Sequence, residues 1–195
     1  MSLAFWKTNS LVQSTIRKIW LWDARQKVKK IIPFLRPNEK ILEVGTGLGT
    51  VSYLLLDKGY QVQGLDVENY CFFPEIDVEV YDGRQFPYPE QSFDTVLILT
   101  VLHHTKDPEA ILGEAARVGK KMIIIEDIYR NVFQKYLTFG VDSIVNWEFW
   151  GHPHSNKTDQ EWKKTFQSLG LALKSSYTYP FVGLFRQVLY LLEKK

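Results

Sequence analysis

The sequence has few cysteines, little net charge and no long hydrophobic run, and each of these shortages excludes a class of protein. Its one cysteine, Cys71, cannot form an internal disulfide and argues against a zinc site made of several cysteines. The net charge of +2 is too small to indicate nucleic-acid binding as the main role. The longest apolar runs, 96–102 and 122–125, are too short to span a bilayer. Since no signal peptide is visible either, we expect a cytoplasmic protein in a reducing compartment.

The chain also lacks internal repeats, low-complexity tracts and linkers rich in proline, serine or glycine. What it has is the composition of an ordinary globular domain, with 45% hydrophobic and 24% charged residues. A chain of 195 residues is long enough to bury a sizeable core. We therefore expect a single domain over residues 1–195.

Apolar periodicity predicts helices that alternate with strands. Strands are expected over 40–44, 60–66, 77–81, 93–102 and 121–126, and two more, over 171–179 and 185–192, end the chain. Helices are expected over 11–35, 50–58 and 108–118, and a last one follows a Thr-x-x-Glu capping box at Thr158 and Glu161.

The fold class that this order predicts is α/β, a Rossmann-like doubly wound and mostly parallel sheet covered on both faces. The last two strands are joined by a short connection, so they should form an antiparallel hairpin at the C-terminal edge. The connection over 67–76 is short for a parallel crossover. We expect one helical turn or an irregular path there.

A glycine-rich turn, in ILEVGTGLGT, follows the first strand. Gly45, Gly47 and Gly49 alternate, unlike the Gly-x-Gly-x-x-Gly of dinucleotide folds. Such a turn lies at the carboxyl edge of a parallel sheet and lets a ligand approach the backbone, although a tight turn without a ligand remains an alternative. Glu43 lies in the apolar strand end, where an unpaired carboxylate is costly. We expect it to accept hydrogen bonds from the loop amides or to meet a cationic ligand.

Two further acids follow strands. Asp66 ends the second strand in QVQGLDVE, where a carboxylate is well placed for both ribose hydroxyls of a nucleoside. Asp82 follows the third strand, and it could accept a hydrogen bond from an adenine amino group, with the Gly83 and Arg84 amides nearby. The alternatives are a surface or helix-capping role for Asp66 and a turn role for Asp82.

At this point the sequence resembles the class I S-adenosylmethionine-dependent methyltransferases, and among them the small-molecule type of ubiquinone and menaquinone biosynthesis. The resemblance covers about 37–127, in ILEVGTGLGT, QVQGLDVE, DGRQFPYPEQSFDTVLILTVLHHTKDPEAIL and EAARVGKKMIIIED, and the tail NKTDQEWKKTFQSLG looks like the family's last helix. It implies methyl transfer from S-adenosyl-L-methionine to a small-molecule acceptor, with S-adenosyl-L-homocysteine as the product.

The resemblance also implies a set of cofactor contacts. The residues expected to hold the methionine part are Glu43, Gly45, Thr46 and Gly47. Asp66 and Val67 would meet the ribose and adenine, Asp82 and Gly83 the adenine edge, and Thr100 would lie against the cofactor. The short 67–76 connection departs from the family, so Cys71, Phe72 or Phe73 is expected to supply the hydrophobic wall over the adenine.

The family pattern divides the chain into three segments. Residues 1–36 would form a helical lid, 37–127 the cofactor-binding core, and 128–195 the acceptor pocket and closing hairpin. The lid carries three tryptophans, Trp6, Trp20 and Trp22, which could line the pocket, although plain packing of an amphipathic helix is the favoured interpretation. Five of its basic residues form a patch that could favour an acidic substrate or a lipid surface, although we interpret it as a solvated helix face: Lys18, Arg25, Lys27, Lys29 and Lys30.

Methyl transfer needs a base only if the acceptor must lose a proton. His103 and His104 follow the fourth strand, and strand alternation favours His104 as the catalytic base if one of them acts. His152 and His154, in WEFWGHPHS, are candidates for substrate contact. A metal site formed by the histidines with Glu148 or Asp127 is the less favoured interpretation, and we expect none.

Other functions stay open beside the leading one. The chain could be a nucleotide-binding module without catalysis, or a protein methyltransferase. The glycine spacing argues against a NAD-dependent oxidoreductase. TVLHH stands where an Asn-Pro-Pro-Tyr-like motif would indicate methylation of nucleic-acid bases, so no nucleic-acid partner is expected, nor a stable membrane insertion. The sequence does not determine the oligomeric state.

Overall fold

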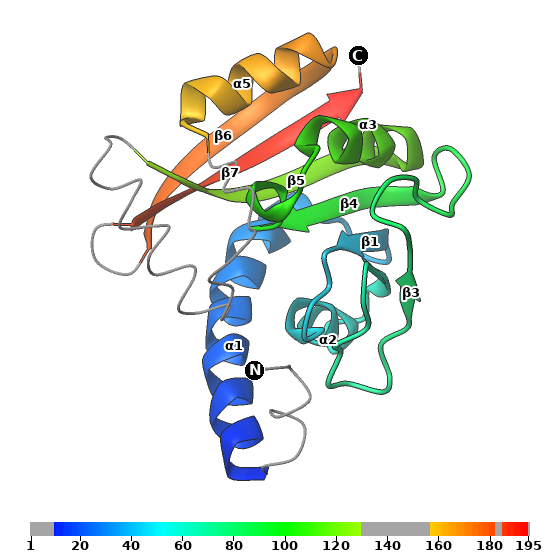
Figure 1. The fold of residues 1–195 in the computed structure, drawn as a ribbon, viewed down its shortest axis with the longest axis vertical. Coiled ribbons are helices and arrows are strands. Elements are labelled where there is room, and N and C mark those ends of the chain that lie inside the picture. The colour runs from blue at the N-terminus through cyan, green and yellow to red at the C-terminus, as the bar shows by residue number, and fades with distance from the viewer. Residues whose placement is uncertain (1–9, 130–156, 182–184, 195) are drawn as a thin grey trace.

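The computed structural model describes residues 10–129, 157–181 and 185–194. They form a seven-stranded sheet with helices on both faces, as Figure 1 shows. The strands are β1 (Lys40–Val44), β2 (Gln61–Asp66), β3 (Val78–Val80), β4 (Phe93–Leu99), β5 (Gly119–Ile128), β6 (Leu171–Phe181) and β7 (Phe185–Lys194). The helices are α1 (Ser10–Ile31), α2 (Thr50–Leu56), α3 (Pro108–Val118) and α5 (Asp159–Ser168), with short 3-10 turns η2 (Ile32–Phe34) and η3 (Leu102–His104).

The strand order is β3-β2-β1-β4-β5-β7-β6. Strands β1 to β5 pair in parallel, and β7 runs antiparallel to both β5 and β6. This confirms the predicted fold class, including the closing hairpin. The order reverses between β1 and β4, and ligands of open α/β sheets bind at such a reversal, beyond the carboxyl ends of the strands.

Each face of the sheet buries its own layer of helices. Helices α1 and α2 cover one face, where Ala24, Val28 and Ile31 pack against Leu97 and other strand residues. Helices α3 and α5 cover the other face, where aromatic and aliphatic side chains form the larger core: Trp162, Phe166, Ile111, Leu112, Val96 and Ile98. Burial on both faces explains why the central strands are hydrophobic at nearly every position.

Two local features were expected and one was not. The capping box of α5 is confirmed, because the Thr158 amide donates to Glu161 Oε2 at 2.7 Å and the Glu161 amide donates to Thr158 Oγ1 at 3.3 Å. The 67–76 connection has no helix in it, which agrees with the second of the two predicted alternatives, an irregular path. The fourth strand, however, ends at Leu99 and not at residue 102. Thr100 has a φ of 62°, which breaks the strand, and the chain then enters η3.

None of the helices in the described part of the chain has the length and apolar character that crossing a bilayer requires.

Candidate functional site

The glycine loop between β1 and α2 is left-handed at all three glycines, with φ of 71° at Gly45, 53° at Gly47 and 75° at Gly49. Protein packing also constrains two of them. A Cβ on Gly45 would lie 2.5 Å from a methyl group of Val101, and one on Gly49 would lie 2.2 Å from the Cys71 sulfur. A Cβ on Gly47 would meet nothing within 4 Å. The open approach to the loop backbone is therefore at Gly47.

Most of the loop amides are already bonded within the protein. The amides of Gly45 and Thr46 donate to the Leu65 carbonyl at 2.8 and 3.4 Å. The Gly47 amide donates to Asp66 Oδ2 at 2.7 Å, and the Gly49 amide to the Thr46 carbonyl at 2.9 Å. The loop is thereby tied to the end of β2.

Thr46, a predicted cofactor contact, is buried and connects the ends of β1 and β2. Its hydroxyl donates to the Glu43 carbonyl at 3.1 Å and accepts from the Leu65 amide at 2.9 Å. Gly64 leaves room for this hydroxyl, since a Cβ there would lie 2.8 Å from Thr46 Oγ1. The Thr46 side chain thus holds the loop on β2, and any ligand contact would come from its neighbours.

Glu43 is 4% exposed, and its hydrogen-bond donors come from α2. The Ser52 amide donates to Glu43 Oε2 at 3.0 Å, and the Ser52 hydroxyl donates to the same oxygen. The expectation that loop amides would serve Glu43 is therefore wrong, because the carboxylate points under the loop to the first turns of α2. Burial raises the pKa of Glu43 to about 7. Ser52 was missed, although a serine in the apolar run TVSYLLL was a visible signal.

Asp66 and Asp82 end neighbouring strands on the accessible side of the loop. Asp66 is half-buried, and its Oδ1 accepts from the Val67 amide at 2.7 Å. Asp82 is exposed, and the Arg84 and Gln85 amides donate to its Oδ1 at 2.9 and 3.1 Å. These donors hold the pKa of Asp82 below its usual range.

Val67 and Gly83 directly follow Asp66 and Asp82 in the sequence and lie at the same edge of the sheet. Val67 is 54% exposed, and a Cβ on Gly83 would lie 3.3 Å from its methyl group. The Tyr81 amide donates to the Asp66 carbonyl at 3.0 Å, which keeps the two strand ends together. The structure therefore brings together the four residues that the sequence analysis placed around the nucleoside.

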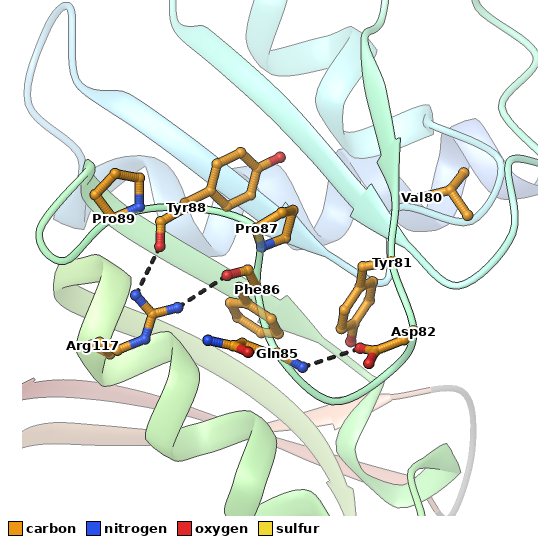
Figure 2. Close-up of a pocket in the computed structure, with 9 residues that line it drawn as sticks. All are labelled: Val80, Tyr81, Asp82, Gln85, Phe86, Pro87, Tyr88, Pro89 and Arg117. Atoms are coloured by element: carbon orange, nitrogen blue, oxygen red, sulfur yellow. Dashed lines mark hydrogen bonds between the residues drawn. The ribbon is translucent and has the colours of Figure 1, made fainter.

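A cavity of about 500 Å³ lies beside Asp82, under the segment that follows β3. Figure 2 shows its lining, in which Arg117 of α3 reaches the carbonyls of Phe86 and Tyr88. Arg117 donates to these carbonyls at 3.0 and 2.7 Å and to both oxygens of Glu114. No glycine of the loop lines this cavity. We therefore define the site by the residues at the strand ends and assign Arg117 a structural role.

The connection after β2 packs against the glycine loop. Phe73 is buried, stacks on Tyr53 of α2 with ring centroids 4.1 Å apart, and lies under the Arg17 guanidinium. It is therefore packed in the protein and does not present a free wall. Cys71 and Phe72 are half-buried, and the Phe72 amide donates to the Leu48 carbonyl at 3.2 Å. These two remain the candidates for the wall over an adenine.

Thr100 stands where β4 ends, and α1 reaches it. Lys27 Nζ donates to Thr100 Oγ1 at 2.9 Å, and the Thr100 amide donates to the Ile125 carbonyl at 2.6 Å. Lys27 is only 7% exposed and pairs with Asp23 at 2.9 Å. Its expected place on a solvated basic face is therefore wrong, because the helix turns this lysine toward the sheet. Nothing in the spacing of the basic residues distinguished it from its neighbours.

The two histidines differ in burial. His103 is buried, and its Nδ1 lies 2.6 Å from Glu126 Oε2. The other Glu126 oxygen accepts from the Val101 and Leu102 amides at 3.0 and 2.8 Å. His104 is half-buried, with its ring centroid 4.0 Å from that of His103. The argument from strand alternation is wrong, because both residues lie in η3.

Several predicted residues fall elsewhere. Trp20 is half-buried and Trp22 is exposed on α1. Asp127 ends β5, and burial raises the pKa of its carboxyl group. The remaining candidates lie outside the described residues: Trp6, Glu148, His152 and His154.

A comparison with protein families matches this arrangement. The model of a methyltransferase domain covers residues 42–122, which include the glycine loop, Asp66, Asp82 and Thr100. Over this core the chain resembles the methyltransferase domain family. The chain is 30% identical over 125 residues to the demethylmenaquinone methyltransferase of Renibacterium salmoninarum, across 56% of this chain and 53% of that protein. The chain thus spans about half the length of that relative.

Solved structures share the fold of this chain. A SAM-dependent methyltransferase from Methanosarcina mazei has a TM-score of 0.69 at 17% identity, over 84% of this chain and 96% of that one. Magnesium protoporphyrin IX methyltransferase from Synechocystis, whose structure contains S-adenosylhomocysteine, has a TM-score of 0.62 at 16% identity, over 96% of this chain and 89% of that one. At these identities the likeness concerns the fold.

Proposed function

We propose that this methyltransferase domain moves the methyl group of S-adenosylmethionine to a small-molecule acceptor by in-line displacement. The observation that carries the proposal is that Gly47, Asp66 and Asp82 follow the neighbouring strands β1, β2 and β3 at the carboxyl edge of the sheet, beside the point where the strand order reverses. Gly47 is open to an approaching ligand, while both acids are accessible at neighbouring strand ends. That is the set of groups that an amino-acid chain, a ribose and an adenine require.

The described residues fit this cofactor. Glu43, Gly45, Thr46 and Gly47 form the floor under its methionine part, with Gly47 as the point of closest approach. Asp66 and Val67 would receive the ribose and adenine, Asp82 and Gly83 the adenine edge, and Thr100 would lie against the amino-acid end. When bound, the cofactor supplies a methyl group on a sulfonium, which is already activated. The protein then has to align the acceptor and exclude water, which together can lower a barrier by about 7–11 kcal/mol.

We assign the acceptor pocket to the segments that precede and follow the cofactor-binding core in the sequence. Residues 1–36 are proposed as a lid, 37–127 as the cofactor-binding core, and 128–195 as the segment that carries the acceptor pocket and the hairpin. His104 is our candidate for a base, since His103 is the more buried of the two and is bonded to Glu126. The relative from Renibacterium salmoninarum is named for a quinone substrate, which favours a small acceptor over a protein.

The first experiment is calorimetric titration with S-adenosylmethionine, S-adenosylhomocysteine and NADH. We expect the two sulfur nucleosides to bind in the micromolar range and NADH not to bind. Absence of binding by both sulfur nucleosides would falsify the proposal. Binding without turnover on any acceptor would instead favour a module that binds the cofactor without catalysis.

The substitution Asp66→Ala tests the nucleoside assignment. It should weaken S-adenosylhomocysteine binding by about 1.5–3 kcal/mol, because hydrogen bonds to a charged group are lost. Asp57→Ala removes an exposed acid at the end of α2 and serves as the matched control. Equal affinities of the two variants would contradict a ribose role for Asp66.

His104→Ala separates a base from a packing residue. If His104 removes a proton from the acceptor, turnover should fall about a hundredfold or more while cofactor affinity stays unchanged. A loss of cofactor affinity of the same size as the loss of turnover would show that His104 shapes the site without acting as a base.

A further inference from the structure

Lys27 has an unusual position for a lysine on α1, a helix that carries six basic residues. Its side chain is 9% exposed, and its ammonium lies 2.9 Å from Asp23 Oδ2 and 2.9 Å from Thr100 Oγ1. An ammonium has three N–H donors. Two are accounted for by these contacts, and within the described ranges no partner is assigned to the third. A buried cation with an unassigned donor is costly unless a further acceptor can reach it.

The place of this ammonium coincides with the amino-acid end of the proposed cofactor site. Its charge lowers the pKa of Glu43, at the end of β1, and the pKa of Asp127, at the end of β5. It thereby opposes the rise in both pKa values that burial causes. Its contact with Thr100 puts it at the end of β4. Lys27 therefore faces the ends of three neighbouring strands, on the side where the sheet order reverses.

The glycine loop has few amides left for a ligand carboxylate. The amides of Gly45, Thr46, Gly47 and Gly49 each bond to Leu65, Asp66 or Thr46. A carboxylate that approached over Gly47 would also meet the negative charge of Asp66 nearby. It therefore needs a cation from another element. Among the described residues, Lys27 is the buried cation that reaches the end of β4.

The backbone at Thr100 gives a second, independent observation. A φ of 62° is a true outlier for a β-branched residue, and it persists only when the surroundings enforce it. The Lys27 ammonium and the Ile125 carbonyl hold Thr100 on both sides, through its hydroxyl and its amide. Strained residues of this kind gather where a ligand is bound.

We infer that the Lys27 ammonium binds the α-carboxylate of the cofactor's methionine part, so that α1 contributes a cofactor ligand as well as a lid. This inference rests on the proposed function, because it names one more residue of the same site. It assigns Lys27 a contact with the amino-acid end and none with the adenosine. The competing explanation is that Lys27 only neutralises the surrounding carboxylates and holds α1 on the sheet.

A pair of ligands separates the two explanations. S-adenosylhomocysteine carries the amino-acid part, and 5′-methylthioadenosine has the same nucleoside and sulfur without it. In Lys27→Met, S-adenosylhomocysteine should bind about tenfold to a hundredfold more weakly, since a charge-assisted hydrogen bond is lost. The affinity for 5′-methylthioadenosine should change less than about twofold, which is a free-energy change well below that of one hydrogen bond. Lys29→Met, an exposed lysine of the same helix, should change neither affinity.

Each outcome of these titrations decides one question. If Lys27→Met weakens both ligands equally, or weakens neither, the inference is overturned while the proposed function stands. If the unmodified protein binds neither ligand, the proposed function itself fails. Lys27→Arg keeps the charge and should retain most of the preference for S-adenosylhomocysteine. If Lys27→Met does not fold, as judged by circular dichroism, loss of that preference in a folded Lys27→Gln together with its retention in Lys27→Arg supports the inference, and an unchanged preference in a folded Lys27→Gln overturns it.

Discussion

Two pairs of carboxylates at the carboxyl edge of the sheet differ in burial: Glu43 and Glu126 are buried, and Asp66 and Asp82 are accessible. Glu43 and Glu126 are 4% and 0% exposed, and each bonds to groups far along the chain or under the loop. Asp66 is half-buried and Asp82 is exposed, and both accept from backbone amides, Asp66 from those of Gly47 and Val67 and Asp82 from those of Arg84 and Gln85. Carboxylates at one edge of the sheet therefore have two different roles. The buried pair assembles the site, and the accessible pair is available to a ligand.

The largest contrast should come from Glu126→Ala set against Asp82→Ala. The first change leaves the Val101 and Leu102 amides and buried His103 without their acceptor. We expect a loss of about 3–5 kcal/mol in the free energy of unfolding, as for a broken buried pair. Asp82→Ala should leave the urea midpoint almost unchanged and should weaken cofactor binding. Similar losses of stability in the two variants would remove the distinction between the pairs.

The pH dependence of stability is the second test, and it concerns Glu43. Its pKa is raised from 4.5 to about 7, so the folded state holds a proton that the unfolded state releases between these values. Stability should therefore fall as the pH rises through this window and level off above it. The difference corresponds to about 3 kcal/mol. Glutamine is a neutral isostere of glutamate, so Glu43→Gln should abolish this pH-dependent part of the unfolding free energy. Urea unfolding between pH 4.5 and 8 would measure it. Parallel curves for the two proteins would contradict the assignment.

A smaller contrast in stability is expected between two glycines of the loop, Gly49 and Gly47. Gly49→Ala combines a left-handed backbone with a collision against Cys71, so we expect a loss of about 2–3 kcal/mol in the free energy of unfolding. Gly47→Ala has only the backbone strain, about 1 kcal/mol, because its new methyl group enters open space. That methyl group should instead obstruct the cofactor. Thermal unfolding and titration of both variants would test this, and a cofactor affinity unaffected by Gly47→Ala would show that the ligand does not approach there.

Much of the fold could be predicted because its signals are local. Hydrophobic runs, the capping box at Thr158 and the glycines after β1 each depend on neighbouring residues, and they located the strands, α5 and the loop. The end of β4 was missed, since nothing in the apolar run through Val101 announces the left-handed turn at Thr100. That turn is imposed by contacts with Ile125 and Lys27, on other elements.

The candidate site divides in the same way. Asp66 and Asp82 could be placed from the sequence, because a residue at the end of a parallel strand lies at the carboxyl edge whatever else packs around it. The partners of the buried groups could not. Ser52 under Glu43 and Glu126 beside His103 depend on how elements pack, and packing is decided by the fit of whole surfaces.

The sequence by itself determined the sheet, the loop at its reversal and the acids at the strand ends, because periodicity and strand ends are properties of short segments. Only the tertiary structure decided that Gly47 is the open glycine and that Lys27, 73 residues from Thr100 along the chain, is the buried lysine of its helix. The physical reason is the rotation of α1 against the sheet. Ala24, Val28 and Ile31 fix that rotation by their packing, and it turns Lys27 inward while Lys29 stays in solvent.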